Sequence, residues 1–120
     1  MKLKKLKHNK KIILDEMKYA TSTLEISKGL MFKGKKEVKK GMCLVIPSNK
    51  DIKFGSSVTM FFCFSDMQIL FINSNFEVVD KKTLKIWTLS YTPKKACKYI
   101  IESIPHRFDD IKIGDKIEII

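Results

Sequence analysis

The sequence predicts a mainly-β domain, built as a compact sandwich or jelly-roll-like barrel of short, largely antiparallel strands. Three observations lead to this fold class. Short apolar segments recur along the chain, separated by turn residues. Only one segment carries the signals of a helix, near residues 22–29. Strands do not alternate with long helices, so the chain lacks the rhythm of a parallel α/β sheet.

The first thirty residues are predicted to contain a tail, a strand and the helix. Residues 1–11 hold six lysines and no acid, which indicates a flexible basic tail; residues 12–120 then form a single mainly-β domain. The segment KIILDEMKYA is expected to be the first strand. Ser22 is followed three residues later by Glu25, which is the spacing of a capping box, and Gly29 can end a helix in a left-handed conformation. The helix is therefore expected over Thr23–Lys28.

Residues 33–40, KGKKEVKK, lie between glycines and are mostly lysine, so a loop or sheet edge is expected there. MCLVIP follows as a short strand that Pro47 stops. The most apolar stretch is SSVTMFFCFSDMQILFIN, residues 56–73. Its polar residues Ser65, Asp66 and Gln68 exclude a membrane span, and two central strands around a turn or bulge are predicted.

The C-terminal part is predicted to continue as strands. Asn73–Asn75 supply a turn, after which the chain should pair back on Met67–Ile72 as a hairpin. Further strands are expected at Ala96–Ile101 and, after a Gly114–Asp115 turn, at Lys116–Ile120.

The net charge of +11 comes from 23 lysines and a single arginine, Arg107, set against 13 acidic residues. The excess is concentrated in residues 1–11 and 33–40. Lysine without arginine favours loose attraction to phosphate, or plain solubility, over sequence-specific reading of nucleic acid. The candidate anion-binding residues are Lys33, Lys35, Lys36, Lys39 and Lys40.

The three cysteines contain no C-x-x-C pair and lie in apolar surroundings, which indicates reduced, buried thiols in a cytoplasmic protein. The N-terminus lacks the apolar core of a signal peptide, and membrane association is not expected. Asp109–Asp110 beside His106 is a weak metal signal, so neither a metal nor another cofactor is predicted.

Several ordered segments resemble one known family. SKGLMF, ILFIN, IW, TPKKACKYIIE and IKIGDKIEI occur in the order and spacing of the domain-of-unknown-function family number 192, over roughly residues 15–120. The most specific matches are Gly29-Leu30-Met31, Phe61-Phe62, Phe71, Trp87, Ala96 and Gly114-Asp115. The resemblance implies a compact mainly-β fold with a small helix near the start, and it carries no established activity.

The resemblance also points to a region for a site. The family's apolar double strand usually carries a His-Thr at its start and a Pro-Ile-Asp before its second half. Here the first pair is Thr59-Met60 and the second motif is Asp66-Met67-Gln68. The imidazole is absent, and the carboxylate is replaced by an amide or displaced to Asp66, which weakens any acid–base or metal role.

The pocket candidates are polar or aromatic residues near the strand pair of residues 57–68. They either converge on a small ligand or have structural roles: turn contacts, a core tryptophan, or a surface pair between a glutamate and a lysine. The candidates are Thr59, Asp66, Gln68, Trp87 and Glu102.

Three hypotheses follow for function. The first is a non-catalytic binding or accessory module for an unknown small ligand, with the oligomeric state open. The second is weak, nonspecific binding of nucleic acid or other anions through the lysine-rich segments. The third is an enzyme using Asp66, Glu102 or Cys63, which the lack of a nearby histidine disfavours.

Overall fold

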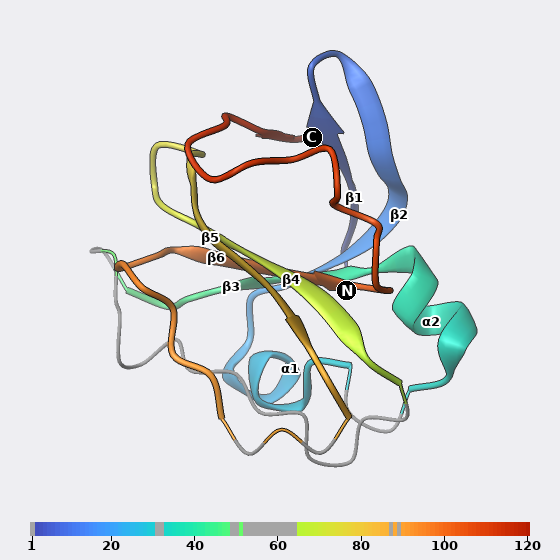
Figure 1. Cartoon of the computed structure of the whole chain (residues 1–120). Helices are drawn as coiled ribbons and strands as arrows, with labels where there is room; N and C mark the ends of the chain where they lie inside the picture. Colours follow the sequence, from blue (N-terminus) through green and yellow to red (C-terminus); the bar gives the residue numbers. More distant parts are fainter. Residues whose placement is uncertain (1, 31–32, 49–50, 52–64, 87, 89) are drawn as a thin grey trace.

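The seven named strands form one mixed sheet, which is twisted and curled (Figure 1). The computed structural model describes residues 2–30, 33–48, 51, 65–86, 88 and 90–120. The strand order is β5-β4-β6-β3-β2-β1-β7; β2 and β3 are parallel and the other neighbours are antiparallel. The mainly-β prediction is confirmed. The strands are β1 Lys2–His8, β2 Lys11–Ala20, β3 Met42–Val45, β4 Met67–Ile72, β5 Val78–Leu84, β6 Tyr99–Ser103 and β7 Glu118–Ile119, and the helices are α1 Thr23–Lys28 and α2 Lys35–Lys40.

The C-terminal segment connects the two ends of this sheet. β7 pairs with β1, whereas the residues just before it contact the start of β5 through a bridge between Glu77 and Lys116. The Val78 amide donates to the Asp115 carbonyl (2.8 Å), and the Ile117 amide donates to the Phe76 carbonyl (3.0 Å). The curled sheet is thereby bridged from β5 to β1 at this end.

The prediction of a flexible tail over residues 1–11 is wrong, because Lys2–His8 form strand β1. β1 is antiparallel to β2, with Leu6 opposite Leu14. Leu6 is fully buried and His8 is 6% exposed, while the lysines of β1 lie at or near the surface. The lysines of β1 thus belong to a solvent-exposed strand face near the edge of the sheet, where polar side chains are tolerated.

Helix α1 has the predicted bounds and the predicted capping box. The Glu25 amide donates to the Ser22 hydroxyl at 3.2 Å, and the Ser22 amide donates to the Glu25 carboxylate at 3.3 Å. Gly29 follows with φ +49° and ψ −130°. Its φ is positive, as predicted, but its ψ lies outside the left-handed helical region.

The prediction of a loop over residues 33–40 is wrong for Lys35–Lys40, which form helix α2. Val38 is fully buried and anchors this short helix, while Glu37 lies in its first turn and Lys39 and Lys40 lie in its last. An acidic residue near the start of a helix and basic residues near its end interact favourably with the helix dipole. A salt bridge of 2.7 Å between Lys18 and Glu37 ties α2 to β2.

Strand β4 is buried along its whole length because each of its two faces contacts a different core. Met67, Ile69 and Phe71 belong to one apolar cluster, and Leu70 and Ile72 belong to the other. The strand and its hairpin with β5 were both predicted and are confirmed. Its predicted partner strand within residues 56–64 lies outside the described residues.

Two C-terminal strands differ in their bounds from the prediction. β6 begins at Tyr99 and not at residue 96, and β7 is limited to Glu118–Ile119. Gly114 takes φ +98° in the expected turn.

Candidate functional site

Glu102 lies in the middle of the sheet, on strand β6 between β3 and β4. It pairs with Met42 on one side and with Ile69 on the other. Cross-strand partners point to the same face of a sheet, so the carboxylate lies on the face of the apolar cluster that includes Ile69 and Met42. Glu102 is only 4% exposed. The sequence alternative of a surface pair between Glu102 and a lysine is therefore wrong.

The end of helix α1 brings backbone directly against this carboxylate. A Cβ atom placed on Gly29 would lie 3.0 Å from Glu102 Oε1 and 3.8 Å from Leu44 Cδ1. Gly29 also has a positive φ, which disfavours side chains on its own account. Both the close approach and the positive φ favour glycine at this position. The end of helix α1 therefore places backbone, without a side chain, next to the Glu102 carboxylate.

Burial raises the pKa of Glu102 to about 7. Desolvation disfavours the charged form, and within the described part of the chain no ion pair compensates for it. A carboxyl group with this pKa is partly protonated at neutral pH, so it can donate or accept a hydrogen bond. Perturbed carboxyl groups of this kind are concentrated at functional sites.

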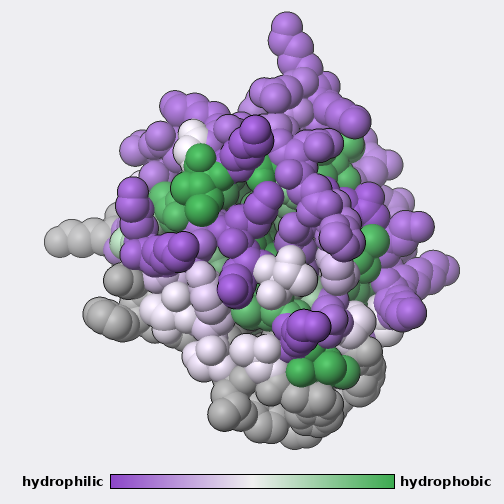
Figure 2. All heavy atoms as spheres, viewed as in Figure 1, coloured by the Kyte–Doolittle hydropathy of each residue, from purple (hydrophilic) through white to green (hydrophobic). Residues whose placement is uncertain are grey.

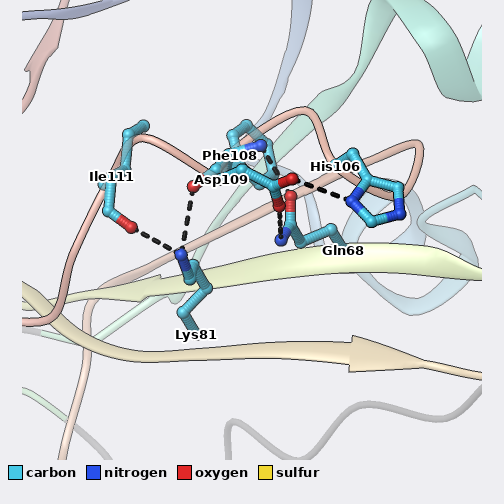
Figure 3. A network of polar contacts seen from close by, with 6 residues as sticks. All are labelled: Gln68, Lys81, His106, Phe108, Asp109 and Ile111. Carbon is cyan, nitrogen blue, oxygen red and sulfur yellow. Dashed lines mark hydrogen bonds and ion pairs between the residues drawn. The ribbon is translucent and has the colours of Figure 1, made fainter.

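Gln68 faces the opposite side of the sheet from Glu102, because it pairs with Ser103, the next residue along β6. Its side-chain amide forms two hydrogen bonds (Figure 3). Its Oε1 accepts the Phe108 amide (2.6 Å), and its Nε2 donates to Asp109 Oδ1 (3.1 Å). The Nδ1 atom of His106 lies 2.8 Å from Asp109 Oδ2. Hydrogen bonds from His106 and then Gln68 hold the pKa of Asp109 below its ordinary range.

Lys81 completes this polar network from the neighbouring strand. Its Nζ donates to the carbonyls of Phe108 (3.2 Å) and Ile111 (2.7 Å), as Figure 3 shows. β4 and β5 thus hold the turn after β6 through two side chains, one from each strand. The role of Gln68 is to anchor this turn.

Asp66 is the third pocket candidate that the structure describes. Asp66 Oδ1 accepts the Ile86 amide at 2.7 Å, so it links the ends of β4 and β5. Thr59 and Trp87 lie outside the described residues. Of the three predicted pocket residues that the structure describes, Glu102 is the one that combines burial, an apolar setting and a shifted pKa.

The predicted anion-binding lysines are located on or next to α2. Lys33 precedes the helix, and the helix itself carries Lys35, Lys36, Lys39 and Lys40. Hydrophilic residues also cover much of the face drawn in Figure 2, above all where β1, β2 and the C-terminal segment lie in Figure 1. Most lysines of the two lysine-rich segments thus lie on β1 and α2, while Lys10, Lys11 and Lys33 lie outside these two elements.

Sequence reasoning did not identify the pair formed by His106 and Asp109 or the contact of Gly29 with Glu102. The only local signal for the His106–Asp109 pair is its spacing of three residues within a turn. Gly29 and Glu102 are far apart in the sequence, so no local pattern predicts their contact. Among the described residues, no group of three His, Cys, Asp or Glu side chains is placed to hold a metal ion. Cys43 is a buried thiol whose pKa burial raises.

Comparison with known proteins identifies the family. The model of the DUF192 family, described as "Uncharacterized ACR, COG1430", matches residues 4–119. The chain belongs to the DUF192 family. The resemblance found in the sequence motifs is therefore confirmed.

Archaeal relatives carry the family name UPF0127. The chain is 36% identical over 105 residues to the UPF0127 protein PH1112 of Pyrococcus horikoshii, covering 86% of each chain. It is 40% identical over 87 residues to the UPF0127 protein TK1120 of Thermococcus kodakarensis, covering 72% of this chain but 52% of that longer protein. The DUF192 chain therefore spans about half the length of the T. kodakarensis relative.

Two crystal structures share the fold. A protein of unknown function from Novosphingobium aromaticivorans superposes with a TM-score of 0.76 at 19% identity, over 97% of this chain and 83% of the other. A protein from Sinorhizobium meliloti 1021 gives a TM-score of 0.79 at 15% identity, over 97% and 91%. At these identities the likeness supports the fold alone. Neither described helix of the DUF192 chain is long and apolar enough to cross a membrane.

Proposed function

We propose that this DUF192 protein is a non-catalytic binding module of the cytoplasm, and that Glu102 recognises its small ligand. The observation that carries the proposal is the position of the Glu102 carboxylate, buried in an apolar cluster and lying against the backbone of Gly29. Apolar sites with one or a few polar groups are typical of small-ligand binding. Glu102 forms no salt bridge with a described residue, and burial raises the pKa of the Cys43 thiol on the neighbouring strand, so both features favour binding over catalysis.

The chemistry of a buried carboxylate favours a ligand that donates hydrogen bonds, above all one bearing an amine. An ionised carboxylate only accepts hydrogen bonds, and its burial is unfavourable unless a donor or cation compensates. An ammonium group would favour the charged form of Glu102 and lower its pKa from about 7. Ligand binding near neutral pH should therefore release a proton.

Ligand-observed NMR tests this proposal. A panel of small primary amines is compared with the alcohols of the same carbon skeleton, using the wild-type protein, Glu102→Gln and Glu118→Gln. Glu118 is an exposed glutamate on β7 and serves as the matched control. We expect amines to bind wild type and the control, and binding to Glu102→Gln to fall by about tenfold or more. Equal binding to Glu102→Gln, or no binding of any amine to the wild type, would exclude the proposed role of Glu102.

A further inference from the structure

A second candidate site lies between β2 and α2 and contains the only arginine of the chain. It is an open groove of about 430 Å³. Four basic and two acidic side chains line it, which leaves an excess of two positive charges. The lining residues are Ile13, Leu14, Asp15, Glu16, Lys36, Lys39, Lys40 and Arg107.

The two acids of the groove are already engaged with lysines. Asp15 accepts a hydrogen bond from Lys5 at 2.7 Å, and Glu16 lies 3.7 Å from Lys40. Within the described chain, no salt bridge neutralises Lys36, Lys39 or Arg107. The positive charge of these three side chains is therefore available to an anion.

Arg107 has a hydrogen-bond donor that none of the described residues satisfies. Its Nε atom is buried and has no hydrogen-bond partner among the described residues. A buried donor without a partner is unfavourable, and such atoms are rare in native proteins. An anion seated against the guanidinium would supply the missing acceptor.

The polar network of Figure 3 fixes the turn that carries Arg107. Arg107 lies between His106, which is bonded to Asp109, and Phe108, whose amide donates to Gln68. The Arg107 amide itself donates to the Ile104 carbonyl at 3.3 Å. The backbone on both sides of Arg107 is therefore held in place, which reduces the entropy lost when its side chain binds a ligand.

We propose that this groove binds the phosphate group of a small phosphorylated molecule. The planar guanidinium of Arg107 can hold two phosphate oxygens at once, and Lys36 and Lys39 add positive charge from α2. The groove offers one arginine and two lysines without a salt bridge to a described residue, which suits a single phosphate group better than the repeated phosphates of a nucleic-acid backbone. The site is separate from Glu102, and neither proposal depends on the other.

The test is a titration of the ¹⁵N-labelled full chain with inorganic phosphate, glycerol 3-phosphate and glycerol, followed by amide shifts. We expect both phosphates to shift amides of residues 106–109 and of α2, and glycerol to shift none. Affinity should fall about tenfold in Arg107→Gln. The control Lys116→Gln removes the same charge from an exposed lysine outside the groove and should change affinity less than about twofold.

Other results would overturn the proposal. Equal phosphate affinity in Arg107→Gln and wild type, or amide shifts confined to other parts of the sheet, would exclude the groove. Tighter binding of a single-stranded oligonucleotide, unaffected by Arg107→Gln and lost between about 50 and about 200 mM salt, would assign the charge to nonspecific attraction instead. If Arg107→Gln does not fold, phosphate affinity is measured in the double variant Lys36→Gln and Lys39→Gln, which changes two exposed residues. A lower affinity than wild type would support the groove, and an equal affinity would exclude it.

Discussion

Glu102 and Gln68 are both buried polar residues of the central strands, but only the side chain of Gln68 has hydrogen-bond partners among the described side chains and turn residues. Gln68 uses its amide to accept from Phe108 and to donate to Asp109. Glu102 lies in an apolar cluster, where burial dominates its pKa. A satisfied amide stabilises the fold, whereas a desolvated carboxylate destabilises it once ionised. These two positions therefore predict different responses to substitution.

Substitution of Glu102 by Gln should stabilise the protein at alkaline pH. The pKa of Glu102 is raised from 4.5 to about 7, so the folded state holds its proton more tightly than the unfolded chain. Stability from this group is fully present below pH 4.5 and is lost as pH rises through about 7. We expect Glu102→Gln to be more stable than wild type at pH 8 by on the order of 3 kcal/mol, with little difference at pH 4.5.

Urea denaturation at a series of pH values measures this difference. Glu118→Gln, which removes an exposed carboxylate from β7, is the control variant. A constant difference between Glu102→Gln and wild type at all pH values would contradict the raised pKa.

Exchanging the donor and acceptor between Gln68 and Asp109 tests the anchored turn. In Gln68→Glu, a carboxylate replaces the amide nitrogen that donates to Asp109, so two negative charges meet at a partly buried site. We expect a loss of about 3 kcal/mol at pH 7. The double variant that adds Asp109→Asn places an amide donor opposite the new carboxylate and should recover about half of the loss. A double-mutant cycle without coupling would show that the contact does not hold the turn.

The helices illustrate which elements local sequence can predict. The two ends of α1 are marked by Ser22, Glu25 and Gly29, all within eight residues, and its bounds follow from them. Helix α2 has no side-chain cap, and its four lysines obscure its one buried residue, Val38. Only the packing of Val38 reveals this helix, and that packing depends on elements distant in sequence.

The same reasoning explains what could be predicted of the strands and the site. The apolar run of β4 was recognisable because both of its faces are buried. Strand β1 was missed because its pairing partners, β2 and the distant β7, determine its structure more than its lysine-rich sequence does. Glu102 was a candidate, but its burial depends on Met42 and Ile69, which other strands supply.

Gly41, where α2 meets β3, should tolerate a side chain poorly. It has φ +83°, and a Cβ atom there would lie 2.7 Å from Leu14 Cδ1 and 3.1 Å from the Glu102 carbonyl. We expect Gly41→Ala to lower the free energy of unfolding by about 1–3 kcal/mol. Gly34, at the other end of α2, has an extended backbone and open space, so Gly34→Ala should cost less than about 0.5 kcal/mol. Equal losses in the two variants, measured by urea denaturation, would contradict the steric argument.

At the scale of the whole molecule, the sheet has a core on each face and a C-terminal segment that joins its ends. One apolar cluster lies on the Glu102 face; the other includes Leu6, Phe108 and Ile117. The second cluster depends on the C-terminal segment and on the turn after β6. Its stability should therefore be sensitive to the pairing of β7 with β1.

Removal of residues 118–120 should open this end of the sheet. Lys5 and Ile120 exchange two backbone hydrogen bonds, of 2.8 and 2.9 Å, and Leu6 pairs with Ile119. We expect the truncation to lower the free energy of unfolding by about 2 kcal/mol and to speed hydrogen exchange at the Lys5 amide. Ile120→Ala keeps the backbone hydrogen bonds, so its free energy of unfolding and its hydrogen exchange at the Lys5 amide should resemble those of wild type. Unchanged exchange at Lys5 in the truncated protein would contradict the closure.

The pairing of β1 with β7 also sets an order of events during synthesis. β1 is synthesised before β7, so the edge of β1 that pairs with β7 stays open until β7 has been made. An open strand edge invites pairing with another chain, and lysines along it discourage that pairing. The lysines of β1 should therefore reduce aggregation before β7 pairs with this strand. Replacing Lys2, Lys4, Lys5 and Lys7 by Thr should increase light scattering during refolding more than it lowers the stability of the finished fold.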